Sequence, residues 1–550
     1  MGDEEPASSG AESVLPKADA ALSAVVPRRA VSRPFPSRPF VPRVFVPLRI
    51  APRAGAYTDP VTWATAVAAF GAYTVISLFR LMQLNPSSWD LGIYTEYIKQ
   101  YADLSAPIVD LRAPGFNLLG DHFQPIVAVL APFFRVFPSS ATLVVGQALL
   151  AAASIFPVSQ LAREKLGTGP GRAIAVAYGF SWGLQQLAQF DFHEIAFAVP
   201  LLAFSLSALA RGHAKAAVGW ALPLVFVKED QGFTVAAIGI YLIVAGLRAP
   251  IPDPRNPADP DGRGRIKAGQ FLLIWGFAWS FVAIGVIIPH FSPVHLYQYW
   301  SDGGVLAPGG HPSVFGVIRQ LLHAWPDKLQ TLIMLLLPTA FIALRSPLVL
   351  IAVPSLLLRF IATDSAYWGT YWHYNATVMP VIFVAAIDAL ARIGAAMDAD
   401  AATGPAGWAS GRRGPWRAAL AGARRYGAAM MVAIAVPLAL QFPLNQLWNA
   451  QTYRTSPHVA EAEAAMARVP DGASVLATLD LLAPLAARTD TYWIGNSGNP
   501  RTQYIVFDGA DSDYTPAIKD VPAFIAGLYP PGTYTEIYSS GDVYVFRLTR

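Results

Sequence analysis

The chain has 550 residues, of which 54% are hydrophobic and only 14% are charged. A soluble protein carries about a quarter charged residues, so this composition excludes an ordinary soluble enzyme and indicates extensive burial in lipid or between helices. The net charge is +4 and there is no cysteine. Disulfides, thiolate metal sites and cysteine nucleophiles are therefore excluded.

The first 58 residues contain no apolar run and are rich in Pro, Ser and Ala, with arginines spread through their second half. No apolar core follows a charged segment, so this is not a cleavable signal peptide. We interpret residues 1–58 as a disordered, basic, cytoplasmic tail. The alternative is a segment that binds anionic lipid headgroups electrostatically.

Eleven apolar runs then predict membrane crossings. In chain order they cover residues 61–84, 141–161, 173–190, 195–210, 216–227, 233–247, 271–289, 331–344, 348–361, 378–393 and 428–447. The stretch 122–137 is short and interrupted by two prolines, which predicts an interfacial or re-entrant helix inside a long first external loop, residues 85–140. With this assignment the strongly basic loops all fall on one side, which the positive-inside rule makes cytoplasmic.

The composition changes after the last apolar run. Residues 459–468 predict a helix, and short runs at 474–478, 491–494, 504–507, 534–539 and 542–548 predict strands. The predicted fold class is therefore an α-helical polytopic membrane protein. Its transmembrane domain covers residues 59–450, and a small C-terminal α/β domain at residues 451–550 lies on the extracytoplasmic side.

Polar clusters gather next to the apolar runs on the predicted external side. Ionisable side chains at membrane depth are costly, and they usually face a cavity or a partner. The turn at Lys228, Glu229 and Asp230 joins two runs that are each shorter than the ~20 residues of a full crossing. We expect this turn to lie below the outer surface in a polar hollow. A purely structural alternative is that Lys228 neutralises Glu229 or Asp230.

Other clusters also allow two interpretations. Asp191 and His193 can point the same way and would suit a divalent cation, whereas Asp191 alone can cap the helix that follows. Asp121, next to His122, has the same ambiguity. Asp90 follows the first crossing and is a reasonable general base, although a lone aspartate in a loop is more often a cap or a solvated residue.

Several familiar motifs are absent from the sequence. There is no P-loop, which argues against ATP hydrolysis, and no Gly-x-Ser-x-Gly elbow of an α/β-hydrolase. No nucleic-acid-binding module is present, so we expect no nucleic-acid partner.

Five short motifs occur in a defined order along the chain. They are Trp89-Asp90-Leu91-Gly92-Ile93-Tyr94, Asp121-His122-Phe123-Gln124-Pro125, Asp191-Phe192-His193, Lys228-Glu229-Asp230 and His373-Tyr374. Over roughly residues 61–392 this set resembles the DUF2079-type family, a prokaryotic family of predicted membrane proteins of unknown function. That family is in turn similar to the GT-C superfamily of membrane glycosyltransferases.

The resemblance implies a multi-pass protein of the bacterial plasma membrane, in contact with membrane lipids. It would move a sugar from a polyprenyl-phosphate-linked donor to an envelope glycan, lipid or protein acceptor. Asp90 would be the catalytic base. The other motif residues would bind the donor phosphate or line the cavity: Asp121, His122, Asp191, His193, Lys228, Glu229, Asp230, His373 and Tyr374. A divalent cation is allowed as cofactor, with Asp191 and His193 as its ligands, although Leu91 and Gly92 follow Asp90 where some GT-C loops carry a second acid.

Two further functional classes stay open. A transporter or flippase of a lipid-linked or polar solute would place its binding groups near the midplane and often contains inverted repeats. Here the polar clusters lie at one face and no internal repeat is evident. A non-catalytic scaffold for envelope assembly is the third class, and it predicts no loss of function when Asp90 and His193 are replaced together.

Overall fold

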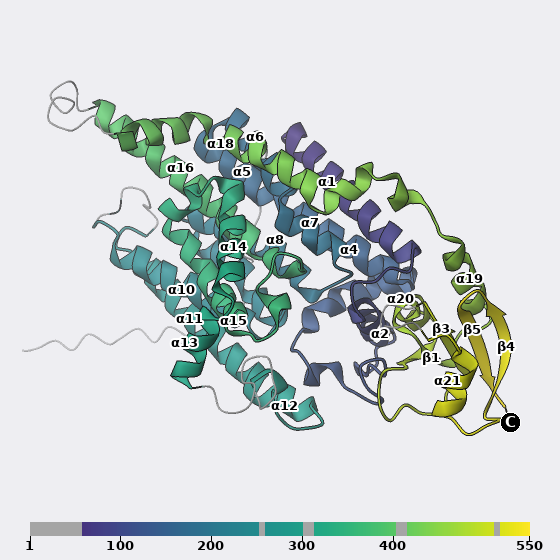
Figure 1. The fold of residues 1–550 in the computed structure, drawn as a ribbon. Helices are drawn as coiled ribbons and strands as arrows, with labels where there is room; N and C mark the ends of the chain where they lie inside the picture. The colour runs from purple at the N-terminus through teal and green to yellow at the C-terminus, as the bar shows by residue number, and fades with distance from the viewer. Residues whose placement is uncertain are drawn as a thin grey trace, which may run out of the picture. The chain divides into compact units, whose positions relative to one another are not determined.

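The computed structural model describes residues 58–251, 253, 259–300, 313–402, 415–510 and 518–549, and most of this chain is helical (Figure 1). All of the predicted basic tail except Thr58 lies outside the described residues. In the part that is described, the helices before the C-terminal domain are α1 (Pro60–Met82), α2 (Asp90–Ala102), α3 (Ala131–Val136), α4 (Ser140–Ala153), α5 (Ile155–Leu166), α6 (Thr168–Gly179), α7 (Trp182–Gln189), α8 (Ala198–Ala210), α9 (Ala214–Ala221), α10 (Gln231–Leu247), α11 (Arg263–Val282), α12 (Ile288–Phe291), α13 (Val314–Leu322), α14 (Trp325–Leu336), α15 (Val353–Ile361), α16 (Val378–Ala402) and α18 (Pro415–Gln441).

The predicted crossings coincide with helical segments. Among the described residues, five are long and apolar enough to cross a membrane: Pro60–Met82, Ser140–Leu166, Arg263–Phe291, His373–Ala399 and Ala418–Gln441. Four more coincide with the shorter apolar helices Glu194–Ala210, Ala214–Phe226, Gln231–Leu247 and Pro347–Ile361. The two remaining runs, 173–190 and 331–344, fold as interrupted helices, α6 with α7 and α14 with the short 3-10 turns that follow it.

The apolar stretch 122–137 belongs to the first loop, residues 85–140. It forms a 3-10 segment, Pro125–Leu130, followed by α3. Together they are too short to cross a bilayer, and Phe133, Val136 and Phe137 are exposed. This is the surface that an interfacial helix presents to lipid, in line with the sequence prediction.

Helices α10 and α11 pack as an antiparallel hairpin in which glycine faces glycine. Glycines recur every seven residues on both helices and meet in the pairs Gly232 with Gly276, Gly239 with Gly269, and Gly246 with Gly262. A Cβ on Gly239 would lie only 2.6 Å from the carbonyl oxygen of Gly269. Because a side chain would not fit there, these glycines allow the two backbones to touch.

The C-terminal domain contains a five-stranded mixed sheet with strand order β2-β1-β3-β5-β4. The strands are β1 (Ser474–Ala477), β2 (Asp490–Trp493), β3 (Tyr504–Asp508), β4 (Tyr534–Ser540) and β5 (Val543–Leu548), and the helices are α19 (Pro457–Met466), α20 (Leu479–Ala486) and α21 (Val521–Leu528). Strand β1 is parallel to β2 and β3, whereas the β3–β5 and β4–β5 pairs are antiparallel. All five predicted strands form, whereas the helices α20 and α21 were not predicted from the sequence.

A helical polytopic membrane architecture with a small C-terminal α/β domain, predicted from the sequence, is therefore confirmed.

Candidate functional site

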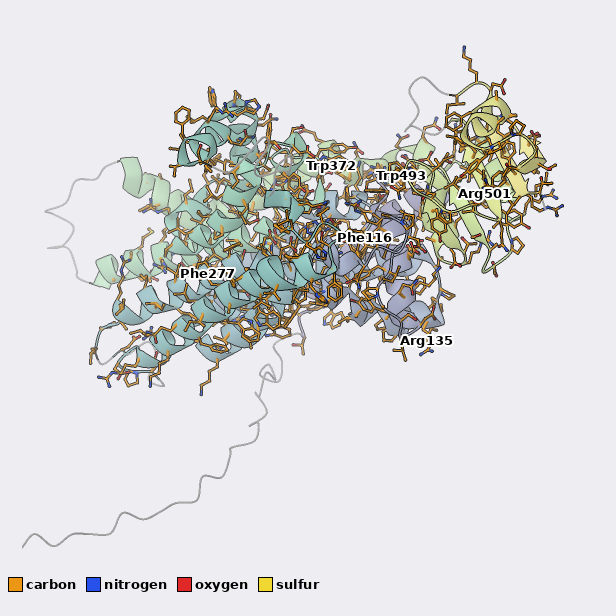
Figure 2. All side chains as sticks on the ribbon, turned by 90° about the horizontal axis from the view of Figure 1, so that it is seen from below. Phe116, Arg135, Phe277, Trp372, Trp493 and Arg501 are labelled. Carbon is orange, nitrogen blue, oxygen red and sulfur yellow. The ribbon has the colours of Figure 1, made fainter. Side chains whose placement is uncertain are left out.

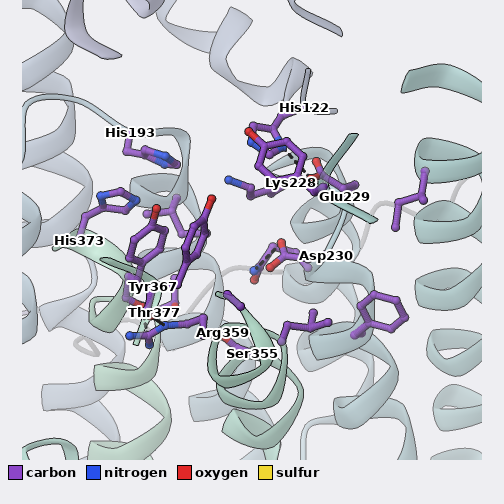
Figure 3. A pocket seen from close by; sticks show the side chains of 18 of the residues that line it. His122, His193, Lys228, Glu229, Asp230, Ser355, Arg359, Tyr367, His373 and Thr377 are labelled. Carbon is purple, nitrogen blue, oxygen red and sulfur yellow. Dashed lines mark hydrogen bonds and ion pairs between the residues drawn. The ribbon is translucent and has the colours of Figure 1, made fainter. Parts of the chain in front are cut away.

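A pocket with an empty volume of about 800 Å³ lies between the first loop, the Lys228 turn, α15 and the start of α16 (Figure 3). Its polar lining includes His122, His193, Lys228, Glu229, Asp230, Arg359, Tyr367, His373 and Tyr374. Its apolar lining includes Ile195, Phe233 on α10, Ile284 just after α11, and Leu358 on α15. The same cavity therefore has a charged part and a part lined by apolar side chains of membrane helices.

Glu229 is the centre of one buried cluster. Its carboxylate lies 2.7 Å from Nδ1 of His122 and accepts hydrogen bonds from the backbone amide of Phe123 (3.1 Å) and the hydroxyl of Tyr297 (2.8 Å). Burial alone would raise the pKa of Glu229, but His122 overcomes this and holds it at about 2. Burial alone would lower the pKa of His122, but the carboxylate of Glu229 keeps it above its usual value. The two groups therefore form an ion pair at neutral pH.

Glu194 is the centre of a second buried cluster. Its side chain is fully buried, accepts a hydrogen bond from the hydroxyl of Tyr94, and lies 3.2 Å from Nζ of Lys228 and 2.6 Å from Nδ1 of His193. Burial would lower the pKa of Lys228, but the carboxylates of Glu194 and Glu229 raise it well above its usual value. The ion pair of Lys228 is thus with Glu194, not with Glu229 or Asp230 as the structural interpretation of the sequence proposed.

Two cationic or basic groups face the pocket without an acidic partner among the described residues. Arg359 is 6% exposed, and its guanidinium donates only to the backbone oxygens of Tyr367 (2.6 Å) and Tyr374 (3.3 Å) and to Oδ1 of Asn375 (3.0 Å). His373 is 1% exposed, and neither ring nitrogen has a hydrogen-bond partner in the part of the chain that the structure describes. Its ring stacks on His193 with centroids 3.8 Å apart. Buried polar groups in this state favour a ligand that supplies negative charge and acceptor oxygens.

Asp230 is the remaining carboxylate on the pocket wall. Its Oδ1 accepts a hydrogen bond of 3.2 Å from the side-chain amide of Gln231, and burial raises its pKa above the usual value. In Figure 3 Asp230 lies across the pocket from His193 and His373.

Three of the residues predicted from sequence do not line this pocket. The carboxylate of Asp191 accepts hydrogen bonds from the backbone amides of Ser87 (2.9 Å) and Ser88 (3.0 Å), and Asp191 lines a second, smaller cavity. Asp191 therefore fixes the start of the first loop, rather than capping the helix that follows it. Asp121 lies 3.6 Å from Nε of Arg112, also within the first loop.

Asp90 is the first residue of α2 and is partly buried. Burial raises its pKa to about 7, and repulsion by Asp191 and Glu194 adds to this effect, while Lys228 works against it. Asp90 is not on the pocket wall, but its charge interacts with that of Lys228, which is. A carboxyl group with a pKa near neutrality can accept or donate a proton under physiological conditions.

The geometry does not assemble a metal site from the predicted ligands. Within the described ranges no group of three or more His, Asp and Glu side chains could hold a metal ion. Asp191 and His193 line different cavities, and the Asp191 carboxylate already binds two backbone amides. A divalent cation stays a prediction from the sequence.

Sequence reasoning missed two central residues. Glu194 directly follows the Asp191-Phe192-His193 motif, so its place beside a polar cluster was readable in the sequence. Arg359 lies inside the predicted crossing 348–361, and a charge within an apolar run is a signal for a functional position. Tyr94 was part of the first motif, but its hydrogen bond to Glu194 could not be read from the sequence. Tyr297, Tyr299 and Tyr367 carried no signal, because their positions depend on tertiary contacts.

Fold and site together define a polytopic helical membrane protein with a buried, charged pocket beside its first loop. The chain belongs to the DUF2079 family of predicted membrane proteins, whose model matches residues 80–522. The family assignment made from the five motifs is confirmed.

The structure is also similar to solved membrane proteins. ArnT from Cupriavidus metallidurans bound to undecaprenyl phosphate is 13% identical, with a TM-score of 0.48 over 89% of this chain and 98% of that one. An Archaeoglobus fulgidus oligosaccharyltransferase tethered with an acceptor peptide is 15% identical, with a TM-score of 0.39 over 90% of this chain and 74% of that one. With TM-scores below 0.5, these similarities assign no activity to this chain. No curated protein matches its sequence.

Proposed function

We propose that this protein is a membrane glycosyltransferase that moves a sugar from a polyprenyl-phosphate-linked donor to an acceptor outside the cytoplasm. The observation that carries the proposal is the two-part lining of the pocket. Arg359 is buried without an acidic partner among the described residues, and apolar side chains of α10, α15 and the segment after α11 line the same cavity. A lipid with an anionic headgroup matches both parts.

In this proposal Arg359, Lys228 and His373 bind the phosphate of the donor, and Asp90 accepts a proton from the acceptor hydroxyl. The acceptor oxygen forms a bond to the anomeric carbon of the sugar, and the bond between that carbon and the phosphate oxygen breaks. The polyprenyl phosphate leaves with the electron pair, and the positive charges of Arg359 and Lys228 stabilise its growing negative charge. A pKa of about 7 makes Asp90 an effective base at neutral pH.

The proposal sets the protein in the bacterial plasma membrane with its N-terminus in the cytoplasm. The pocket and the C-terminal domain then face the envelope, where the acceptor is a glycan, lipid or protein. This orientation is supported by the distribution of Arg and Lys among the loops.

The test is binding of undecaprenyl phosphate to the purified full chain in nanodiscs, measured by native mass spectrometry. Because hydrogen bonds to a charged group contribute about 1.5–3 kcal/mol, Arg359→Gln should weaken binding about 10- to 100-fold. Arg345→Gln is the matched control, because Arg345 is exposed and lies outside the pocket. Equal affinity of the unchanged chain for undecaprenol and undecaprenyl phosphate would contradict the proposal, since it would show that no headgroup is recognised.

A further inference from the structure

The C-terminal domain packs directly on the first loop. Nζ of Lys99 on α2 donates to the backbone oxygen of Thr489 (2.6 Å), and Oγ of Ser140 donates to that of Ala483 on α20 (2.7 Å). A Cβ on Gly92 would lie 3.1 Å from Cβ of Leu482, so a glycine at this position lets α20 approach α2 closely. The C-terminal domain therefore contacts α2, the helix that begins at Asp90, and holds it in place.

Two side chains at and just beyond the end of β2 contact the first loop: Trp493, the last residue of the strand, and Asn496. The ring of Trp493 meets the ring of Trp89, the neighbour of Asp90, edge to face with centroids 4.8 Å apart. The side-chain amide of Asn496 donates to the backbone oxygens of Leu111 (2.8 Å) and Arg112 (3.3 Å). Figure 2 shows Trp493 on the side of the C-terminal domain that faces Phe116 of the first loop.

Arg112 continues these contacts toward the pocket. Its guanidinium lies over the ring of Trp89, 5.4 Å from the centroid, and its Nε lies 3.6 Å from the carboxylate of Asp121. Asp121 directly precedes His122, whose ring pairs with Glu229 on the pocket wall. Contacts therefore run from the C-terminal domain to Trp89 and Asp121, which directly precede Asp90 and His122 in the chain.

We propose that the C-terminal domain is a positioning element of the site, acting through Arg112 and Trp89 on Asp90 and His122. About half of the loop 85–140 lies outside its α- and 3-10 helices, and such segments have many accessible conformations unless contacts hold them. Trp493 restricts the loop at Trp89, next to the predicted base Asp90. Asn496 restricts it at Leu111 and Arg112, and Arg112 in turn contacts Asp121 beside His122. The inference rests on the proposed function only for the choice of ligand used as a probe.

The first test is hydrogen–deuterium exchange of the full chain without ligand, comparing the unchanged protein with Trp493→Ala/Asn496→Ala. Loss of an aromatic pair and two hydrogen bonds should speed exchange about tenfold across residues 87–123 and leave α10 and α11 unchanged. Tyr529→Ala is the matched control: it removes an aromatic pair of the same domain, with centroids 4.9 Å apart, between Tyr529 and Tyr534. Unchanged exchange in the double variant would overturn the inference.

The second test is the affinity for undecaprenyl phosphate of these variants and of two variants at Arg112. We expect about a tenfold loss in the double variant and in Arg112→Ala, partial recovery in Arg112→Lys, which keeps the charge opposite Asp121, and no loss in Tyr529→Ala. Faster exchange with undiminished affinity would overturn the inference, because the loop would then not reach the pocket. Faster exchange in a protein that binds no undecaprenyl phosphate would support the inference and contradict the proposed function.

Discussion

The carboxylate of Glu229 lies 2.7 Å from Nδ1 of His122, although 107 residues separate the two in the chain. The pair joins the first loop to the turn that precedes α10. Ser280 on α11 donates to the backbone oxygen of Glu229 at 2.6 Å, so the same turn is also anchored to the glycine hairpin. These two contacts couple the loop that carries Asp90 to α10 and α11, whose backbones touch.

Replacing Glu229 by Gln should lower the free energy of unfolding by roughly 3 kcal/mol, because it leaves a buried histidine without its countercharge. The pKa of Glu229 is lowered from 4.5 and that of His122 is raised from 6.5. The ion pair therefore contributes its full stabilisation of the folded state between pH 4.5 and pH 6.5. This stabilisation is lost as the pH rises through the raised pKa of His122. Thermal melting at pH 5.5 and at pH 9 should show the larger loss at pH 5.5.

Glu164→Gln is the matched control for this prediction. Glu164 also forms an ion pair, with Arg211, but its side chain is 45% exposed. A solvent-exposed pair contributes about 0–1 kcal/mol, so this variant should melt close to the unchanged protein. Similar melting temperatures for the two variants would mean that the His122–Glu229 pair has no special role.

Replacing His373 by Phe should separate stability from binding. Both ring nitrogens of His373 are buried and find no hydrogen-bond partner within the described ranges, and such groups cost about 1–3 kcal/mol. A phenyl ring keeps the stacking on His193 and Phe190, so the variant should melt at a higher temperature while its affinity for undecaprenyl phosphate falls. A lower melting temperature would show that the nitrogens stabilise the fold.

Replacing Asp90 by Asn should lower the rate of sugar transfer about 10²- to 10⁴-fold without changing the melting temperature. The pKa of Asp90 is raised to about 7, so the carboxylate forms only as the pH rises through 7. Activity of the unchanged protein should therefore rise between pH 6 and pH 8, and residual activity of the variant should lack this step. Asp103→Asn, at the exposed end of α2, is the control and should keep the full profile.

Replacing Gly239 by Ala should destabilise the protein by about 1–3 kcal/mol, since the added Cβ would collide with the backbone of Gly269. Gly71→Ala on α1 adds the same atom where nothing lies within 4 Å, so it should be neutral or slightly stabilising. The melting temperatures of the two variants in detergent test the difference. A harmless Gly239→Ala would show that α10 and α11 can separate at no cost.

Much of the architecture could be predicted because run length and alternation of apolar residues report burial directly. The runs 173–190 and 331–344 show the limit of this reasoning. Their apolar character was visible, but the breaks in their helices were not. Ala340 and Phe341 have positive φ angles of 48° and 61°, a backbone state that neither residue type favours and that only tertiary packing imposes.

The site could be predicted as a set of motifs but not as a set of contacts. Sequence spacing carries no information on which of several acids Lys228 meets, and the structure pairs it with Glu194. From the spacing of the residues, the expected partner of Asp191 was a metal ion or the end of a helix. In the structure its carboxylate instead accepts hydrogen bonds from the backbone amides of Ser87 and Ser88, about a hundred residues away in the chain. The two missed residues had readable signals: Arg359 is a charge inside an apolar run, and Glu194 directly follows a polar motif.

The glycine contacts between α10 and α11 also decide which side of the pocket can open. Phe233 on α10 and Ile284, just after α11, belong to the same wall, and helices whose backbones touch resist both sliding and separation. The facing helix, α15, is short and follows a 3-10 segment, Pro347–Ala352. We therefore expect the wall formed by α10 and α11 to keep its shape when a bulky ligand binds, and the shorter α15 to be the helix that shifts.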